Sequence, residues 1–391
     1  MVGAAISDCH LGAVRFSKTE DGRSAHEVAV ERAWFAAVDA IIASGDVQLC
    51  TIAGDLFEHH RVGVRAMVAY LRGVRRLSDA GIIVVVLAGN HDVPRSSDSL
   101  TPLALLADYL TLGALAEVHI VTEPRTIDLT VYGDCQRMDG YEIVDDATKE
   151  TVHVACFPFV TLADPKVYQL NVAPQADVNI LVAHCSVAGD DLGLPKFYGH
   201  DAAFNVTALA ERFDVVALGD YHSFTRLHPS RLAFYSGSLE FTSTNLWAEA
   251  PEKGWVWYDT ATGTMELREV KGRTVESHDE PGAWNADGVN GWLRHQLDRS
   301  DLATTLLRLV VEDFPPAEKA QLDQRLVREL KGRAAHFQLD LKMAKSASAE
   351  IGDRREGGKS LADAAREWFA EDEAAVRELA FKYMEVPRTC A

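Results

Sequence analysis

The chain has 391 residues, of which 47% are hydrophobic and 25% are charged, which fits two or three globular domains and excludes general disorder. Its formal net charge of −19 (39 Lys and Arg against 58 Asp and Glu) argues against a protein that holds nucleic acid by a globally basic surface. The longest aliphatic run, residues 82–88, is far shorter than the ~20 apolar residues that span a bilayer, so no membrane-spanning helix is expected.

The cysteines and the first residues indicate a compartment. The six cysteines form no C-x-x-C pair, and Cys9, Cys50, Cys156 and Cys185 lie in or beside apolar runs. Small buried thiols of this kind are typical of a reducing compartment. The opening MVGAAISDCHLG lacks the basic stretch of a secretory signal. We therefore expect a cytoplasmic protein with reduced cysteines and no membrane association.

Alternating strands and helices are predicted in the first half. Residues 48–53 and 82–88 are runs of β-branched and aliphatic residues, which predict buried strands. A helix precedes the first of them: Ser24 and Glu27 form a capping box at its start, and Gly45 stands where it should end. Its predicted apolar face consists of Val30, Trp34, Val38 and Ile41.

A second helix is predicted between these two strands. Its expected apolar stripe consists of Val64, Val68, Leu71 and Val74. The other faces form a basic patch in an acidic chain, made of Arg61, Arg65, Arg72, Arg75 and Arg76. This patch is either a solvated helix face or a contact for a phosphate backbone. Arg15, Arg61 and Arg65 are the candidate contacts for such a backbone.

Eight shorter strands follow, and they decide the predicted fold class. They are expected at residues 118–121, 126–131, 152–157, 179–183, 215–218, 233–235, 255–258 and 265–268. This mixture favours two packed sheets over one doubly wound sheet. We predict an α/β fold (four layers, α+β) in which two packed mixed β-sheets are flanked by helices, over residues 1–270.

The sequence changes in character after about residue 270. A helix near Trp292, a strand at 305–311, a helix after Pro316 and a strand at 336–341 predict a small α/β domain over residues 271–344. Residues 345–360 are poor in apolar side chains and predict a linker. A helical tail over 361–391 carries Trp368, Phe369, Val376, Leu379 and Phe381. So many large apolar groups must bind either a partner or the chain's own body.

Five short motifs place metal-type ligands directly after predicted strands. They are SDCHLG with Asp8 and His10, GDLFE with Asp55, GNHD with Asn90, His91 and Asp92, AHCS with His184, and GDYHS with Asp220 and His222. Functional residues of α/β folds gather at the carboxyl ends of strands. Any one motif is common, but five in order are not. Mixed oxygen and imidazole donors suit Mn²⁺, Fe²⁺ or Zn²⁺, and two ions ~3.5–4 Å apart serve displacement at phosphorus.

The motif order D-x-H, G-D, G-N-H-D, H, G-x-x-H resembles the calcineurin-like metallophosphoesterases. More narrowly, the chain is similar to the SbcD-type nucleases of DNA double-strand-break repair. SDCHLG, GDLFE and residues 235–259 (YSGSLEFTSTNLWAEAPEKGWVWYD) carry this narrower resemblance. It covers residues 1–270 as the nuclease domain, and residues 271–344 match the family's capping domain in layout.

The resemblance implies a site of two divalent cations, with Mn²⁺ the first expectation and Mg²⁺, Fe²⁺ or Zn²⁺ as alternatives. Asp8, His10 and His222 would hold one ion, Asn90, His184 and Asp220 the other, and Asp55 would bridge them. His91 would protonate the leaving oxygen, and Asp92 would orient His91. The family usually has His where this chain has Asp220, which biases the site toward harder ions. Alternatively, Asp220 lies outside the ligand shell.

The implied function is a metal-dependent DNA phosphodiesterase, an exonuclease and endonuclease acting on DNA ends in repair or recombination. It would act as a homodimer with an SbcC-type coiled-coil ATPase, which the helical tail would contact. One alternative is a stand-alone phosphoesterase on a nucleotide or phosphoprotein, which would not need the second α/β domain. The other is a non-catalytic scaffold for the ATPase, against which the full ligand set with His91 and Asp92 argues.

Overall fold

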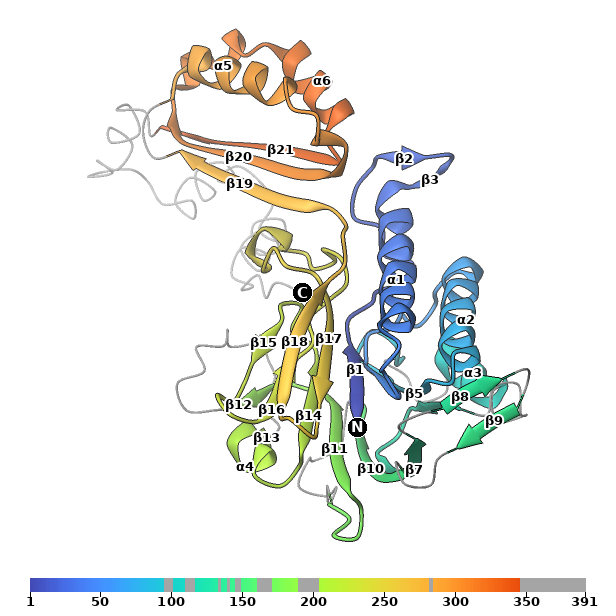
Figure 1. The fold of residues 1–391 in the computed structure, drawn as a ribbon. Coiled ribbons are helices and arrows are strands. Elements are labelled where there is room, and N and C mark those ends of the chain that lie inside the picture. The colour runs from blue at the N-terminus through green and yellow to red at the C-terminus, as the bar shows by residue number, and fades with distance from the viewer. Residues whose placement is uncertain are drawn as a thin grey trace, which may run out of the picture.

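Two six-stranded mixed sheets form the body of the protein (Figure 1). The computed structural model describes residues 1–94, 101–109, 117–132, 135–138, 141–144, 149–159, 171–188, 204–280 and 284–344. The first sheet has the order β18 (Thr264–Glu269), β17 (Gly254–Asp259), β1 (Val2–Ile6), β4 (Leu49–Ala53), β5 (Ile83–Leu87) and β6 (Val118–Val121). The second has the order β15 (Thr225–Arg226), β16 (Leu232–Tyr235), β14 (Val215–Gly219), β11 (Val178–His184), β10 (Lys149–Phe157) and β7 (Arg125–Tyr132). The α/β class with two mixed sheets is confirmed.

The central strands of both sheets run parallel, so their carboxyl ends share an edge. In the first sheet β1, β4, β5 and β6 are parallel, and in the second β10, β11, β14 and β16 are parallel. Successive side chains of a strand point to opposite faces. Accordingly Cys50 and Val84 pack under the helices, whereas Leu49 and Val85 pack against the second sheet. Both faces are buried, which explains the unbroken aliphatic runs.

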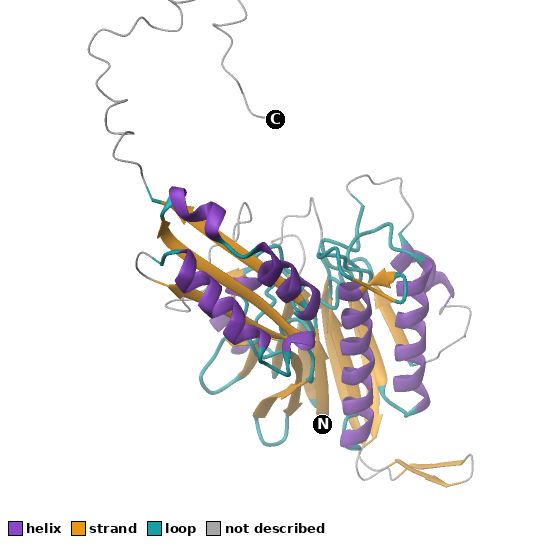
Figure 2. Cartoon of the chain, turned by 90° about the horizontal axis from the view of Figure 1, so that it is seen from above, coloured by secondary structure: helices purple, strands orange, loops and turns teal. Residues whose placement is uncertain are grey.

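Helix α1 (Ala25–Ser44) agrees with its prediction at both ends and on its buried face. The Ser24 hydroxyl accepts from the Glu27 N–H at 3.4 Å, and Gly45 ends the helix in a left-handed conformation with φ 74°. All four predicted face residues are buried, and Trp34 is fully enclosed. Figure 2 shows α1 and α2 side by side on the outer face of the first sheet.

Helix α2 (Val64–Asp79) buries only part of its predicted stripe: Val74 is fully buried and Leu71 is partly buried against the core, as expected, but Val64 and Val68 are not. Val64 and Val68 are 69% and 37% exposed, whereas Ala66, Ala69, Tyr70, Gly73, Val74 and Leu77 are buried. The indole of Trp34 explains the difference, because its Nε1 donates to the Ala69 carbonyl at 3.0 Å. Only small residues let α2 approach this ring so closely, so the Ala and Gly face turns inward and Val64 and Val68 remain outside.

We expect Gly73→Ala to lower the free energy of unfolding by about 1–3 kcal/mol, the usual cost of overpacking. A Cβ at Gly73 would lie 2.4 Å from Trp34 Nε1 and 2.5 Å from two of its ring carbons. Urea unfolding measures this as a lower midpoint at constant m-value. Gly291→Ala is the matched control, because Gly291 lies in a helix with open space around it, and it should stabilise by about 0.5–1 kcal/mol. An unchanged midpoint in Gly73→Ala would contradict tight packing of α2 on Trp34.

A separate parallel sheet of three strands follows: β19 (Thr274–Glu280), β20 (Thr305–Phe314) and β21 (His336–Met343). Helices α5 (Ala286–Leu297) and α6 (Gln324–Arg333) cover one face of it (Figure 1). The predicted helix after Pro316 is a 3₁₀ helix (Pro316–Gln321) followed by α6. Strand β19 was not predicted. We call residues 271–344 the cap, as the proposed second domain.

The cap rests on the body through a small apolar cluster. Phe241 and Leu246 of the body pack with Leu306 and Ala335 of the cap, and Phe16 stacks on His336 with ring centroids 4.1 Å apart. The Lys18 ammonium donates to the carbonyls of Gly332 and Ala334, at 3.0 and 2.7 Å. Cations favour this position because it is the carboxyl end of α6.

The remaining strands, helices and cysteines can also be compared with the predictions. Each of the ten strands predicted between residues 48 and 268 is present, with its ends shifted by at most a few residues. Unpredicted elements include α3 (Pro102–Tyr109), α4 (Val206–Ala210) and short pairs such as β2–β3 (Thr19–Glu20, Arg23–Ser24). Cys9, Cys50 and Cys156 are buried and free, and Cys185 is partly exposed. None of the described helices is long and apolar enough to cross a bilayer. The predicted linker and tail lie outside the described residues.

Candidate metal centre

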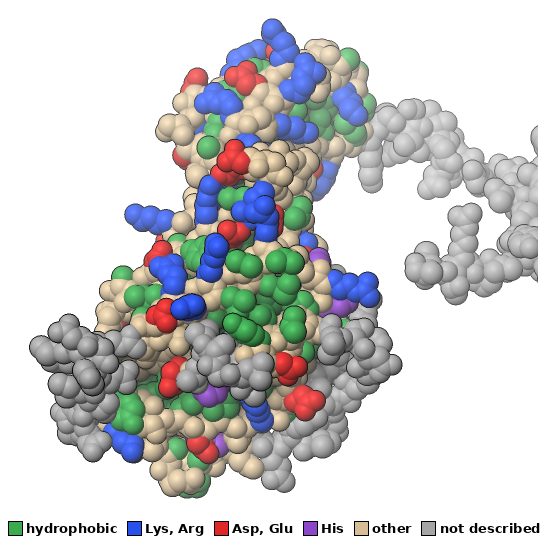
Figure 3. Space-filling model, turned by 90° about the vertical axis from the view of Figure 1, so that its right-hand side faces the viewer, with side chains coloured by type: hydrophobic (Ala, Val, Ile, Leu, Met, Phe, Trp, Pro, Cys, Tyr) green, Lys and Arg blue, Asp and Glu red, His purple; other side chains and the backbone are tan. Residues whose placement is uncertain are grey.

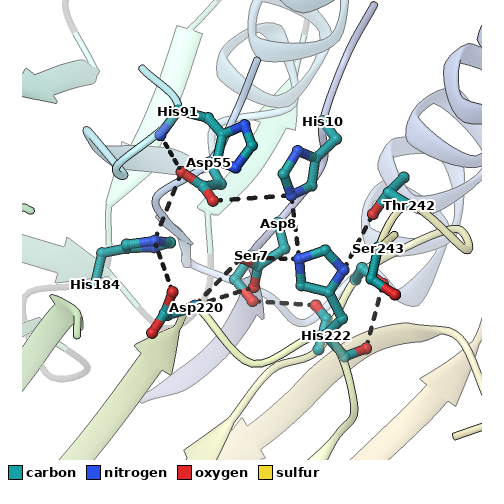
Figure 4. Close-up of polar contacts among 12 residues, drawn as sticks. Ser7, Asp8, His10, Asp55, His91, His184, Asp220, His222, Thr242 and Ser243 are labelled. Carbon is teal, nitrogen blue, oxygen red and sulfur yellow. Dashed lines mark hydrogen bonds and ion pairs between the residues drawn. The ribbon is translucent and has the colours of Figure 1, made fainter. Parts of the chain in front are cut away.

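The candidate ligands meet where the carboxyl ends of the two sheets come together (Figure 4). Asp8 and His10 follow β1, Asp55 follows β4, and Asn90 follows β5; in the second sheet His184 ends β11, and Asp220 and His222 follow β14. The prediction that each of these motifs directly follows a strand is therefore confirmed. Asp8, His10, Asp55 and His184 are buried, and the other three are partly exposed.

The backbone is strained at these residues. Among the described non-glycine residues, positive φ occurs at six positions, and four of them are candidate ligands: Asp8 (50°), His10 (46°), Asp55 (47°) and Asp220 (102°). Such a conformation costs on the order of 1–3 kcal/mol and is concentrated at functional sites. The chain therefore gives up stability to hold these side chains in place.

Two glycines of the motifs allow loops to approach one another. A Cβ on Gly89 would lie 2.1 Å from Asp55 Oδ1, and one on Gly219 would lie 1.9 Å from the Ala53 carbonyl oxygen. The loop after β5 thus packs directly on Asp55, and the end of β14 packs directly on the end of β4. Residues with a side chain would push these two pairs of segments apart.

The first group of donors is formed by Asp8, His10 and His222, whose ligand atoms lie within 4.8 Å of one another. His10 Nε2 is 3.2 Å from His222 Nε2, and the latter is 3.9 Å from Asp8 Oδ1. Each Nδ1 contacts another group: that of His10 lies 3.1 Å from a Glu58 carboxylate oxygen, and that of His222 lies 3.2 Å from the Thr242 hydroxyl. The two Nε2 atoms therefore lie close together beside the Asp8 carboxylate, an arrangement that could bind a cation.

The second group surrounds His184. Its Nε2 lies 2.9 Å from Asn90 Oδ1, 3.6 Å from Asp55 Oδ1 and 3.8 Å from Asp220 Oδ1. Its Nδ1 lies 2.8 Å from the Ala53 carbonyl oxygen, which fixes the ring. The other oxygen of Asp55, Oδ2, lies 3.8 Å from His10 Nε2. Asp55 therefore presents one oxygen to each group, as a residue shared by two ions would.

The electrostatics of the site also favour positive charge. Burial alone would lower the pKa of His184, but the charges of Asp55, Asp220 and Asp8 outweigh it and raise this pKa to about 9. Burial raises the pKa of Asp220. Buried carboxylates so close together are costly unless cations compensate them. The oxygen and imidazole donors of these residues fit divalent ions of the Mn²⁺ or Zn²⁺ type.

His91 and Asp92 are both at the site, but they do not contact each other as predicted. The two Asp92 oxygens accept from the backbone N–H groups of Leu56, Phe57 and Gly89, at 2.9 to 3.1 Å. His91 Nδ1 lies 2.5 Å from the Glu58 carbonyl oxygen, and its backbone N–H donates to Asp55 Oδ1. The expectation that Asp92 orients the His91 ring is therefore wrong: Asp92 holds the loop backbones together, and Glu58 orients the ring.

The three candidate DNA contacts lie in different surroundings. The Arg15 guanidinium is 23% exposed; its Nη2 lies 3.0 Å from Glu58 Oε1, and its Nε donates to the Thr242 carbonyl at 2.8 Å. Those groups position donors of the first group, so Arg15 supports the site from behind. Arg61 and Arg65 are exposed at the start of α2, and their contact with DNA stays a prediction.

Several residues that support the ligands were not predicted from the sequence. Ser186 donates to Asp220 Oδ2 at 3.1 Å. The buried Lys253 ammonium donates to the His222 carbonyl and to the Ser238 hydroxyl, at 2.8 and 2.9 Å, and pairs with Glu249. Glu58 could have been found from the sequence, because it is the last residue of the GDLFE motif. The sequence pointed less clearly to Lys253, which is the lysine of the segment 235–259.

This fold and site define a metallophosphoesterase. The family model "Calcineurin-like phosphoesterase" matches residues 3–224, more than half of the chain, and the chain belongs to this family. The family binds divalent metals, and the donor groups described above are consistent with that. The fold class and the family expected from the motifs are therefore confirmed.

Several similar curated proteins carry the name DNA double-strand break repair protein Mre11. That of Methanopyrus kandleri is 25% identical over 209 residues, covering 51% of this chain and 42% of the relative. That of Sulfurisphaera tokodaii is 24% identical over 223 residues (56% and 48%), and that of Haloferax volcanii 27% over 274 residues (69% and 51%). The chain thus spans about half the length of these curated relatives.

Proposed function

We propose that this chain is a metal-dependent phosphodiesterase that hydrolyses DNA, acting as an exonuclease and endonuclease on DNA ends. The observation that carries the proposal is Asp55, which presents one oxygen to each of two donor groups. This is the arrangement that two ions in one phosphoesterase site require. The DNA substrate is supported by the relatives, whose names place them in double-strand break repair.

Seven residues would hold the ions: Asp8, His10, Asp55 and His222 on one side, and Asp55, Asn90, His184 and Asp220 on the other. When bound, two divalent ions supply positive charge for the phosphate oxygens and lower the pKa of an attacking water. Mn²⁺ is the proposed ion, because four carboxylate and amide donors join three imidazoles. Asp220 in place of the usual imidazole moves the second group further toward oxygen.

His91 is proposed as the group that protonates the leaving oxygen. Its ring stands edge-on to His10 with centroids 4.8 Å apart, so it borders the first group. Its Nδ1 faces the Glu58 carbonyl and can only donate to it. In the protonated ring, the second proton is therefore on Nε2, the atom that is free to transfer it.

The negative charge is distributed unevenly along the chain, and a less acidic region is more compatible with a DNA substrate. Residues 284–344 of the cap carry nine Lys and Arg and nine Asp and Glu, so their net charge is zero against −19 for the whole chain. Helix α6 exposes Arg325, Arg328, Lys331 and Arg333. Basic side chains also gather on the cap in Figure 3. The cap therefore repels a phosphate backbone less than the chain as a whole does.

The partners are proposed on narrower grounds. An SbcC-type coiled-coil ATPase is proposed from the resemblance, with the tail (residues 361–391) as its contact.

A homodimer is proposed through α2 and α3, because Val64, Val68, Leu105 and Tyr109 are large apolar side chains that remain exposed there. Figure 3 shows hydrophobic side chains gathered on this side of the molecule. Exposed apolar groups of this kind mark interaction surfaces. A cytoplasmic location is proposed from the free cysteines.

The proposed function predicts two Mn²⁺ ions per chain and Mn²⁺-dependent cleavage of DNA. Metal analysis after Mn²⁺ loading and gel filtration should find two ions, and linear duplex and single-stranded DNA should be cut in Mn²⁺ but not in EDTA. Parallel assays with nucleoside monophosphates and a phosphopeptide separate the alternatives. Cleavage of these monoesters without cleavage of DNA would favour a stand-alone phosphoesterase. Binding of two ions with no hydrolysis at all would favour a scaffold, and no specific binding would reject the metal centre.

A further inference from the structure

A closed ring of polar contacts lies behind the first donor group. His10 Nδ1 contacts Glu58 Oε2 at 3.1 Å, and Glu58 Oε1 contacts Arg15 Nη2 at 3.0 Å. The Arg15 Nε donates to the Thr242 carbonyl at 2.8 Å, and the Thr242 hydroxyl contacts His222 Nδ1 at 3.2 Å. The two Nε2 atoms, 3.2 Å apart, close the ring. It joins the loop after β1, the loop after β4 and the loop around Thr242, and Arg15 and Thr242 are 227 residues apart in sequence.

The chemistry of Glu58 fixes the tautomer of His10. A carboxylate only accepts hydrogen bonds, so the contact requires the proton of His10 to be on Nδ1. In a neutral imidazole, Nε2 then carries the lone pair, and Nε2 is the atom that faces His222 and Asp55. A carboxylate behind a metal-binding imidazole also raises the basicity of the other nitrogen.

Arg15 determines where the Glu58 carboxylate can lie. The side chains of Glu58 and Arg15 are only 13% and 23% exposed, so this ion pair is shielded from solvent. Each carboxylate oxygen has one donor, His10 or Arg15, and Arg15 itself is fixed by the Thr242 carbonyl. A glutamine at position 58 could not satisfy both donors, because it has one acceptor oxygen and its NH₂ group would face another donor.

We propose that Glu58, anchored by Arg15, is the positioning residue of the first cation group, and that it holds His10 in the tautomer whose Nε2 lone pair faces the site. This rests on the proposed function, in which His10 is a ligand. Glu58 acts through its side chain on His10, whereas its contact with His91 is made by the backbone carbonyl. Substitution of the Glu58 side chain therefore separates the two effects.

The test is the affinity of Glu58→Gln for Mn²⁺ alone, measured by the EPR signal of free Mn²⁺ during titration. Loss of such a supporting contact weakens metal binding by about 10–100-fold. We expect that loss for one of two ions and a much smaller change for the other. Glu276→Gln is the matched control, since Glu276 is also partly buried and pairs with Arg299 at 2.6 Å, but in the cap. It should leave both Mn²⁺ affinities unchanged.

A second readout needs no metal. In protein with ¹⁵N-labelled histidine, the chemical shifts of His10 should report a proton on Nδ1, and Glu58→Gln should shift the tautomer toward Nε2. If Glu58→Gln unfolds, Arg15→Gln removes only the anchor and should weaken the same ion by a smaller factor. Mn²⁺ affinities of folded Glu58→Gln within twofold of the unchanged protein would overturn the proposal, as would an equal loss in Glu276→Gln. If the unchanged protein binds no Mn²⁺, the proposed function fails. The ¹⁵N shifts of His10 would then still test whether Glu58 fixes its tautomer.

Discussion

His91→Gln is expected to slow phosphodiester hydrolysis by ~10²–10⁴-fold while the protein keeps both metal ions, because the substitution removes the proposed proton donor but no proposed ligand. His91 Nδ1 faces the Glu58 carbonyl, and glutamine can donate to that carbonyl in its place. The backbone contact from residue 91 to Asp55 does not depend on the side chain. Single-turnover DNA cleavage and metal analysis of the same sample provide the two measurements.

His119→Gln is a suitable control for this prediction, since His119 is a half-buried histidine of β6 that takes no part in the donor groups. It should change neither the rate nor the metal content. His10, Asp55 and His91 also have ligand atoms within 4.8 Å of one another, so His91 is close enough to be a ligand. Loss of one ion in His91→Gln would show that it is one, and would remove the proposed proton donor.

The body of the fold could be predicted because its strands are buried on both faces. Strands β4 and β5 have no exposed residue, so their sequences are unbroken aliphatic runs. Such a run can be recognised as a strand without knowing which strands lie beside it. Strand β19 was missed for the opposite reason. Its sequence, TVESHDE, is mostly polar, and it becomes a strand at the edge of the cap sheet by pairing in parallel with β20. Tertiary contacts decide such a segment, and the sequence carries no local signal for them.

The exposure of Val64 and Val68 on α2 has a similar cause. Helical spacing alone favours a buried stripe of Val64, Val68, Leu71 and Val74, of which Val74 is buried and Leu71 is partly buried. The Trp34 ring instead requires the glycine and alanine face, because the Ala69 carbonyl accepts its Nε1–H. The sequence shows both faces, but the choice between them depends on a residue of another helix.

The candidate ligands could be predicted, whereas most of their supporting residues could not. A ligand that directly follows a strand is placed by that strand, so local sequence is sufficient. The supporting partners of His222, which include Ser238, Thr242 and Lys253, come from a later segment that no local pattern connects to it. The role of Asp92 was misjudged because the resemblance, and the usual pairing of carboxylates with catalytic imidazoles, implied a contact with His91, whereas its buried carboxylate binds backbone N–H groups of two loops.

Asp220→Asn is expected to weaken binding of the second ion and to remove most of the activity if Asp220 is a ligand of that ion, because a neutral amide oxygen replaces a charged carboxylate oxygen. Its Oδ1 lies 3.8 Å from His184 Nε2, and its backbone N–H donates to the Asp8 carboxylate, so the residue is part of the wall between the two groups. Asparagine is preferable to alanine here, because the φ of 102° is unfavourable for ordinary residues and asparagine tolerates positive φ better. The substitution therefore removes the negative charge with the least change in backbone strain.

Two further variants separate ligation by Asp220 from a merely supporting role. Asp220→His introduces the imidazole usual in the family and should keep both ions, with a weaker preference for Mn²⁺ over Zn²⁺, because imidazole suits zinc better than a carboxylate does. Ser186→Ala removes only the hydrogen bond to Asp220 Oδ2 and should cost about 10–100-fold in affinity at most. Asp220→Asn should exceed that loss, because it changes the donor itself and not a group behind it. Equal effects of Asp220→Asn and Ser186→Ala on Mn²⁺ binding, with normal turnover in both, would place Asp220 outside the ligand shell and leave Asp55, Asn90 and His184 to hold the second ion.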